Sequence, residues 1–376
     1  MSEHLAADVA IVGGGTVGCS TALHLRRRGA SVVLLERGLC GGQASGVNYG
    51  GVRQQGRDLR ELPLARRSRE MWGRLDEIVG TDCEFMASGH IKLARAATEM
   101  AELEAYRDAV RPYGLELELL DREQLRARYP FLGDAAVGGS LCAEDGQANP
   151  RLLAPAFARA ARAQGADIRE HAHVVEVRRD GTRFLVRTAD GVELGAGALL
   201  NAAGAWGHEI AAQFGEAVTE SVMAPNMCVT EPLPYFMVPN FGVCGGGIYV
   251  RQIPRGNVIF GGGRAIADRE HVRSHPLAGT SLAAAVQAIA LVPRLRHAQI
   301  IRTWTGIEGG MPDDIPVIGP SRTTPGLFHA FGFSGHGFQL GPAVGAVLAE
   351  LILDGATPTP IAAFDIARFA SSEAVR

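Results

Sequence analysis

The sequence lacks the paired cysteines that would hold a metal cluster. Its six cysteines are scattered, and none belongs to a CxxC pair: Cys19, Cys40, Cys83, Cys142, Cys228 and Cys244. Zinc sites, iron–sulfur sites and the disulfide frameworks of small secreted domains all depend on characteristic cysteine spacings. We therefore predict no metal site held by this chain alone, and we expect a reducing, cytoplasmic setting.

Long apolar runs and an excess of one charge are also missing. The longest apolar stretches, such as Ser281–Val292, are interrupted and short, and no signal-peptide pattern precedes the first expected strand. We expect no transmembrane segment. The 37 basic and 40 acidic residues leave a net charge of −3, which does not predict a nucleic-acid partner. A chain of 376 residues is long enough for about two domains.

The stretch Asp8–Arg37 combines a strand, a glycine-rich turn, a helix and a second strand. Val9–Val12 are four consecutive apolar residues, typical of a buried parallel strand. Three glycines follow in GxGxxG spacing: Gly13, Gly15 and Gly18. Apolar residues then recur at helical spacing, and the second strand, Ser31–Leu35, leads into Glu36. This order is the one in which dinucleotide-binding motifs occur.

Each of these residues has a physical task in such a motif. Gly13 allows the tight turn, Gly15 lets a pyrophosphate approach the backbone, and Gly18 lets the helix pack closely on the strand. The helix N-terminus offers free N–H groups to the phosphates. Glu36 is placed to accept the ribose hydroxyls. A glycine-rich turn without a ligand is the alternative, but the complete pattern favours a dinucleotide site.

The loop Gly38–Arg57 holds seven glycines in 20 residues, too many for a helix or a strand. Because it follows the ribose-binding acid, we expect Ala44 and Ser45 to lie near the pyrophosphate, and Arg53 to reach a flavin or a substrate carboxylate. The alternative is a mobile surface linker.

A second glycine-rich turn, Gly332–Gly337, precedes a long apolar helix that we expect to begin near Leu340. This helix supplies another N-terminus with free N–H groups. Such an end would stabilise the negative charge of a reduced flavin. The second turn therefore favours FAD over NAD, because a NAD-dependent Rossmann dehydrogenase, the alternative, leaves it without a task.

The middle of the chain predicts a different sheet. Gly247–Ile253 and Asn257–Gly261 read as short strands, and Tyr249 and Arg251 share one face of the first by the two-residue period. They are candidate substrate contacts, although two residues on a solvated sheet face are an equal alternative. The predicted FAD-binding domain comprises residues 1–79, 142–205 and 300–376. The predicted substrate-binding domain comprises residues 80–141 and 206–299.

With these residues in view, the chain resembles the superfamily of D-amino-acid oxidase, glycine oxidase and sarcosine oxidase. The resemblance rests on GGGTVG with Glu36, HVVEV, NAAGAW, MPDDIPVIG and GFSGHGFQLGPAVG. It implies an α/β fold with an α+β insertion: a Rossmann-like FAD domain of the glutathione-reductase type, and a substrate domain with a mainly antiparallel sheet. The FAD contacts that it implies are Gly13, Gly15, Gly18, Glu36, Arg37, Ala44, Ser45, Val174, Ala203, Gly204, Gly335, His336, Gly337, Phe338 and Gln339.

Within this superfamily, GVRQQGR and RTWTGIEGGMPDDIPVIG are similar to catalytic β-type subunits of heteromeric dehydrogenases. Those enzymes act on D-hydroxyproline, opines such as octopine and nopaline, L-proline or sarcosine. Their partner subunits carry further redox centres, in some members FMN and a [2Fe–2S] cluster. The resemblance thus implies an amino-acid substrate and partner subunits. A stand-alone glycine or D-amino-acid oxidase that produces hydrogen peroxide, and a non-catalytic flavin-holding subunit, are the alternatives.

Three positions depart from the pattern of the resemblance. Thr303–Thr305 stand where monomeric sarcosine oxidases attach flavin through a cysteine, so we expect non-covalent FAD. Gln339 replaces a lysine and Glu308 an arginine, each a carboxylate binder in relatives. The remaining candidates for that role are Arg53, Arg251 and Arg302. Alternatively, Glu308 receives a cationic group of the substrate, as in an opine derived from arginine.

The implied reaction oxidises the C–N bond of a secondary amino acid, with hydride transfer from the carbon beside nitrogen to flavin N5. The cofactor carries the difficult chemistry, and the protein binds, orients and excludes water. His336 is a candidate base, and a turn histidine that only holds the glycine-rich loop is the alternative. The predicted catalytic set is Arg53, Tyr249, Arg251, Glu308 and His336.

Overall fold

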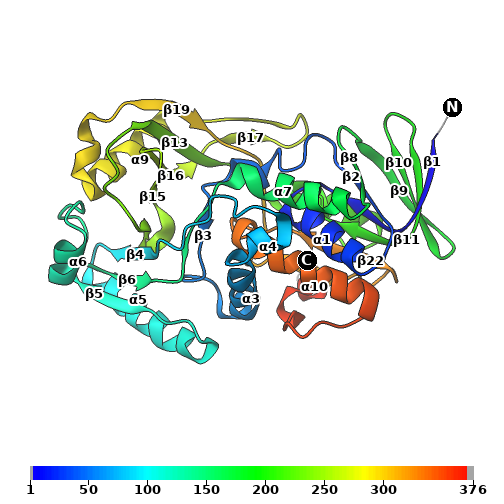
Figure 1. Ribbon diagram of the computed structural model, residues 1–376, viewed down its shortest axis with the longest axis horizontal. Coiled ribbons are helices and arrows are strands. Elements are labelled where there is room, and N and C mark those ends of the chain that lie inside the picture. The colour runs from blue at the N-terminus through cyan, green and yellow to red at the C-terminus, as the bar shows by residue number, and fades with distance from the viewer. Residues whose placement is uncertain (1–2, 371–376) are drawn as a thin grey trace.

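The computed structural model describes residues 3–370, which are organised around two large sheets lying side by side along the long axis (Figure 1). The first sheet has 8 strands, with the path β21-β22-β11-β1-β2-β8 and with β10 joining β11 to β9. Pairing is parallel from β8 to β22, while β21, β9 and β10 pair antiparallel. Its strands are β1 (His4–Val12), β2 (Val32–Leu35), β8 (Asp167–Arg169), β9 (Val174–Asp180), β10 (Arg183–Thr188), β11 (Glu193–Asn201), β21 (Val317–Pro320) and β22 (Leu327–Phe331).

The apolar end of β1 divides between the two faces of this sheet, as the two-residue period of a strand requires. Val9 and Ile11 belong to the core under α1, α7 and α10, whereas Ala10 and Val12 belong to the core shared with β9, β10 and α8. Both faces are therefore covered, which is why the strand reads as a continuous apolar run. These helices are α1 (Thr16–Arg27), α7 (Pro150–Ala163), α8 (Gly207–Gln213) and α10 (Gly337–Asp354).

The second sheet also has 8 strands, in the order β19-β13-β16-β15-β14-β4-β6-β5, and is antiparallel except for the pair β14–β4. Helix α9 packs on it at one end of the molecule, and α5 and α6 lie at the β4–β5 edge (Figure 1). Its strands are β4 (His90–Ala94), β5 (Glu118–Asp121), β6 (Gly138–Cys142), β13 (Pro225–Pro232), β14 (Asn240–Val243), β15 (Tyr249–Gln252), β16 (Asn257–Arg264) and β19 (Ile300–Trp304). The helices are α5 (Ala97–Val110), α6 (Arg122–Arg128) and α9 (Ala278–Leu291).

Short elements connect the two sheets. The helices among them are α2 (Ala44–Val47), α3 (Leu62–Trp72) and α4 (Leu75–Val79). The two-stranded pairs are β3 (Gly51–Val52) with β7 (Gly146–Gln147), β12 (Ser221–Met223) with β20 (Glu308–Gly310), and β17 (Ile266–Asp268) with β18 (Arg273–His275).

The predicted fold class is confirmed, and the differences lie at element boundaries. The helix α10 begins at Gly337 rather than near Leu340, because the glycine-rich turn runs directly into it. Helices α3 and α4 are separate, with a break at Gly73 and Arg74. Strand β19 pairs with β13 in the second sheet, although the predicted boundary at residue 300 assigned it to the first domain.

Helix α10 is long and apolar enough to cross a membrane by length and composition, with a mean hydropathy of 1.3 over its 18 residues. However, 72% of it is buried inside the protein, and a packed core helix passes the same test. The stretch that looked longest in the sequence, Ser281–Val292, instead lies mostly within the 14-residue helix α9.

Helices α1 and α10, which each follow a glycine-rich turn in the first domain, cross at very short distance. A Cβ atom on Gly341 would lie 2.6 Å from Cγ2 of Thr16, and one on Gly345 would lie 2.2 Å from Oγ of Ser20. The Ser20 hydroxyl donates to the carbonyl of Pro342 at 3.0 Å. This contact needs residues without side chains at both positions of α10, and it fixes the N-termini of the two helices relative to each other.

We predict that Gly345→Ala lowers the free energy of unfolding by about 1–3 kcal/mol, because the added methyl overpacks the contact with Ser20. The measurement is equilibrium unfolding in denaturant. Gly279→Ala is the matched control, since a Cβ at this position of α9 meets nothing within 4 Å. Equal stability of the two variants would contradict the interpretation of the helix crossing.

Candidate functional site

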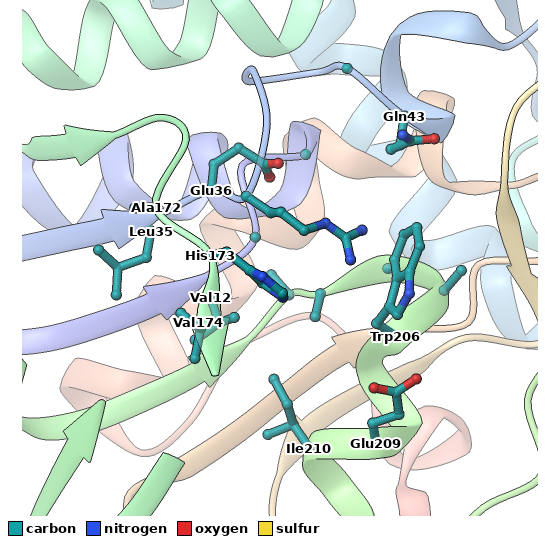
Figure 2. A pocket seen from close by; sticks show the side chains of 18 of the residues that line it. Val12, Leu35, Glu36, Gln43, Ala172, His173, Val174, Trp206, Glu209 and Ile210 are labelled. Carbon is teal, nitrogen blue, oxygen red and sulfur yellow. The ribbon is translucent and has the colours of Figure 1, made fainter. Parts of the chain in front are cut away.

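A cavity of about 470 Å³ opens at the carboxyl end of β1, where the first glycine turn lies (Figure 2). Gly13 has φ +109°, and a Cβ there would lie 2.2 Å from the carbonyl oxygen of Ala202. A Cβ on Gly18 would lie 2.0 Å from the carbonyl oxygen of Gly13. At Gly15, by contrast, the nearest atom is Oγ of Ser45 at 3.1 Å, and the residue lines the cavity. Two glycines thus serve the fold, and the third leaves room for a ligand.

Glu36 closes the other side of this turn. Its Oε2 accepts from the Gly14 N–H at 2.6 Å, and its Oε1 accepts from the Gly38 N–H at 2.7 Å. In Figure 2 the carboxylate lies beside the glycine turn, with Trp206 across the cavity. The guanidinium carbon of Arg37 lies 4.1 Å from the centroid of the Trp206 ring. The other residues of the predicted nucleotide set that line this cavity are Ala44, Ser45, Val174, Ala203 and Gly204.

A second cavity, of about 1070 Å³, continues from the first toward the other sheet. The two share six lining residues: Gly15, Ala44, Ser45, Ala202, Gly204 and Ala205. The structure brings most of the predicted reaction site together here: Arg53, Tyr249, Glu308, Gly335, His336, Gly337 and Phe338. One continuous space therefore joins the nucleotide motif, the second glycine turn and the second sheet.

Besides Gly18, which serves the helix–strand contact, three of the predicted residues do not line this space. Gln339 is buried, and its side-chain amide donates to the carbonyl of Ala65 at 2.8 Å. Arg251 is buried on the far side of Tyr49, with its guanidinium carbon 5.3 Å from that ring, and donates to the carbonyl of Ala148 at 2.9 Å. Arg302, named as a carboxylate binder, is exposed on β19. Arg53 is thus the member of that arginine set that lines the cavity.

Two charged residues that the sequence analysis did not select also line the cavity, Arg57 and Glu61. Arg57 is buried, and its Nη1 is without a hydrogen-bond partner among the described residues. Burial lowers the pKa of Arg57 to about 10, assisted by the charge of Arg53. The spacing of the sequence does point to Glu61. It precedes Ala65 and Ser68 of α3 by four and seven residues, and because both are buried, an acid at this spacing lies on the packed face of the helix.

Glu61 holds His336 at the start of α10. Nδ1 of His336 lies 2.9 Å from Oε1 of Glu61, and Oε2 of Glu61 is buried without a partner among the described residues. Burial opposes ionisation of Glu61, but the hydrogen bond from His336 and the charge of Arg57 lower its pKa. Burial, with the charge of Arg57, lowers the pKa of His336 to about 4 despite the carboxylate. The pair is therefore a neutral imidazole that donates to a carboxylate near pH 7.

We predict that the free energy of unfolding falls as the pH drops from 6.5 toward 5, by roughly 1 kcal/mol per pH unit from His336. The pKa of His336 is about 4 in the folded chain against an ordinary 6.5, so the unfolded chain takes up the proton first. Denaturant unfolding at several pH values measures the slope. His336→Gln should reduce it by about that amount, with the part from buried His24 and His90 remaining, whereas His297→Gln, an exposed control, should leave it unchanged. An equal slope in His336→Gln would contradict the assignment.

The residues present fit a dinucleotide with a redox-active ring. The N-cap residues of α1 and α10 make no side-chain cap, so first-turn N–H groups remain available to a ligand at both helices, although the Thr16 N–H of α1 donates to the Ser45 hydroxyl at 3.0 Å. The hydroxyl oxygen of Thr16, the first residue of α1, is buried beside the second cavity with no partner in the described part of the chain. An anion at α1 would satisfy these donors. One cavity thus combines a strand–turn–helix motif, an acid after the second strand and the N-terminus of a second helix. Together these features define a flavin-dinucleotide oxidoreductase.

Comparison with known proteins gives the family. Residues 8–351 match the family of FAD dependent oxidoreductases, and the chain belongs to it. It is 29% identical over 371 residues to glycine oxidase of Geobacillus kaustophilus, and this alignment covers 96% of this chain and 97% of that protein. It is 27% identical over 386 residues to the B subunit of opine oxidase of Rhizobium meliloti, and this alignment covers 98% of this chain and 99% of that protein. The solved L-proline dehydrogenase from P. horikoshii superposes with a TM-score of 0.90 at 27% identity, covering 98% of this chain and 99% of that one.

The chain is therefore an FAD-dependent oxidase or dehydrogenase that acts on CH–NH bonds of amino acids. This resolves the choice between FAD and NAD in favour of FAD. Of the predicted FAD contacts, Gly13, Gly15, Glu36 and Ser45 line the first cavity, and Gly335 and Gly337 line the second.

We predict that Gly15→Ala folds but binds less FAD, because the new methyl meets only Ser45 at 3.1 Å while it narrows the phosphate approach. The ratio of flavin absorbance to protein, measured after purification, should fall several-fold, with the far-ultraviolet circular dichroism unchanged. Gly279→Ala, which faces open space, is the control and should keep its FAD. Full FAD content in Gly15→Ala would contradict the assignment.

Proposed function

We propose that this enzyme oxidises the C–N bond of a secondary amino acid and does so as the catalytic subunit of a heteromeric dehydrogenase. The observation that carries the proposal is that Glu308 lines the second cavity. Oε1 of Glu308 accepts from the Gly335 N–H at 2.7 Å, at the turn that leads into α10. A carboxylate here, in place of an arginine, favours a substrate with a cationic group over a simple amino acid.

Relatives whose names describe such enzymes support the same class. The opine oxidase relative and the beta chain of sarcosine oxidase, both from Rhizobium meliloti, are 27% and 29% identical to this chain. Each name describes one component of a larger enzyme and a secondary amine as the substrate. The partner subunits that we propose would carry any FMN and any [2Fe–2S] centre. This chain has no cysteine cluster that could hold the [2Fe–2S] centre.

The side chains suggest how the substrate is held. Tyr249 lines the cavity from β15, in edge-on contact with Tyr49 at 4.6 Å between ring centroids. Arg57 and Arg264 are cations available to the carboxylate beside the reacting bond. Burial raises the pKa of Glu308, and the Gly335 N–H and Arg264 oppose this rise. The protein thus binds and orients the amine, while FAD, when bound, accepts the two electrons.

The neutral state of His336 restricts its role. An imidazole that donates Nδ1–H to Glu61 presents its other nitrogen as an acceptor. With its pKa lowered to about 4, His336 is too weak a base to take the proton of an ammonium, but it can accept a hydrogen bond from the N–H of a bound amine and so orient it.

We propose non-covalent FAD. None of the six cysteines lines either cavity. In the segment where relatives carry the attachment cysteine, Trp304 instead donates its indole N–H to the carbonyl of Val47 at 2.8 Å. This tryptophan fastens the loop that borders the cofactor cavity.

The experiment that tests the function is a substrate panel with dye reduction as the readout: D-hydroxyproline, octopine, nopaline, L-proline, sarcosine, glycine and D-alanine. Secondary amino acids should be oxidised at higher kcat/KM than the primary amines glycine and D-alanine. Rates confined to primary amines would reject the proposal.

A second candidate is a stand-alone oxidase, because glycine oxidase of Geobacillus kaustophilus matches over almost the whole of both chains. The same panel run in air distinguishes the two. Stoichiometric hydrogen peroxide from the isolated chain would favour the oxidase, and dye reduction without peroxide would favour the dehydrogenase.

We further predict that Glu308→Gln lowers kcat/KM for octopine about tenfold, because it removes a charge-assisted hydrogen bond to the guanidinium of that substrate. The value for sarcosine, which lacks a cationic side chain, should change less than about threefold and serves as the internal control. Equal losses for both substrates would show that Glu308 acts on the site in general and does not receive a substrate cation.

A further inference from the structure

The chain contains one lysine, Lys92, while its other 36 basic residues are arginines. Lys92 lies in β4, half-buried, two residues after His90, which lines the second cavity. In the second sheet it stands opposite Gly242 of β14, and Gly242 stands opposite Tyr249 of β15. Residues opposite each other on neighbouring strands share a face, so Lys92 projects from the same face as Tyr249. Gly242 leaves the space between them free of a side chain.

The end of Lys92 meets Arg53 beside Gly56. Arg53 and Gly56 line the cavity, and Lys92 lies directly behind them without lining it. The position that a Cβ of Gly56 would occupy lies 2.8 Å from Nη1 of Arg53 and 3.1 Å from Nζ of Lys92. The two cationic nitrogens are therefore less than about 6 Å apart. A carboxylate is small enough to be bound by both cations at that separation.

No acid of the described chain neutralises this pair. Lys92 has no hydrogen bond or ion pair there, and Nη1 of Arg53 donates only to the carbonyl of Gln55. Of the nearby carboxylates, Glu61 binds His336, and Asp145 accepts from the backbone N–H groups of Gln54 and Gln55. Glu102 is exposed and acts on Lys92 only through its charge. Burial lowers the pKa of Lys92, and the charge of Arg53 adds to this effect. Two like charges partly removed from water favour an anionic ligand.

We propose that Arg53 and Lys92 form a second carboxylate subsite, and that the substrate is a secondary amino acid with a further carboxylate beyond the one beside the reacting bond. This rests on the proposed function. The subsite lies two strands, about 10 Å, from Tyr249 along the sheet. Arg57 and Arg264 are left for the first carboxylate. The glycine at position 242 lets the substrate extend between the two subsites.

Because Lys92 is the only lysine, its amine can be observed directly. Reductive methylation of the FAD-loaded enzyme with ¹³C-formaldehyde labels Lys92 and the chain's α-amine, and Lys92→Arg, which lacks the first signal, assigns it. Titration with iminodiacetate should shift the Lys92 methyl resonance saturably. Sarcosine, which differs by lacking one carboxylate, should shift it much less. No shift with iminodiacetate and none with nopaline would overturn the proposal.

Kinetics test the same subsite through matched substrates. In the wild type, kcat/KM should be higher for iminodiacetate than for sarcosine, because iminodiacetate carries one more carboxylate. Lys92→Met should reduce that preference about tenfold, and Lys92→Arg should retain it. Arg107→Gln, which removes an exposed cation of the same domain, is the control for net charge. If Lys92→Met does not fold, Lys92→Gln replaces it, with FAD content as the check.

The outcomes separate the two proposals. If no secondary amino acid is oxidised while iminodiacetate still shifts the Lys92 resonance, the proposed function fails and the subsite stands. If secondary amino acids are oxidised but iminodiacetate is not preferred over sarcosine, or the preference persists in Lys92→Met, the subsite is rejected and the proposed function stands.

Discussion

The close crossing of α1 and α10 is the contact on which the site depends. The two helices come from opposite ends of the sequence, and each begins at a glycine-rich turn. Gly341 and Gly345 let them approach until side chains of α1 touch the backbone of α10. Their N-termini therefore open on the same continuous cavity, one beside Gly15 and one beside His336. A molecule long enough to reach both ends needs a nucleotide at one and an electron-rich ring at the other, which is a property of FAD.

The second domain contributes the chemical character of the remaining cavity. Its sheet presents Tyr249 to the space above the α10 turn, while the loop from the first domain supplies Arg53, Arg57 and Glu61. Charged groups of both signs thus line one cavity. Among them, the pKa of His336 and that of Glu61 are both lowered, which keeps the imidazole neutral and the carboxylate ionised at neutral pH.

Much of the nucleotide half could be predicted from the sequence because its signals are local. The spacing of Gly13, Gly15 and Gly18 fixes a turn within a few residues, and the strand before it reads directly from four apolar residues. The substrate half could not be predicted to the same depth. Tyr249 and Arg251 share a strand and were equivalent in sequence, yet only Tyr249 lines the cavity, because the Tyr49 side chain stands in front of Arg251. Lys92 depends on strand pairings between residues more than a hundred positions apart, which no local pattern contains.

The loop that carries Ala44 and Arg53 is attached to both halves of the molecule. Ser45 accepts from the Thr16 N–H in α1, whereas Val47 accepts from Trp304 in the second sheet and Arg251 packs against Gly50. A change in the position of the second sheet is therefore transmitted to the wall of the nucleotide cavity. In thermodynamic terms, any change that substrate binding makes in the affinity for the cofactor through this loop is matched by an equal change that the cofactor makes in the affinity for substrate.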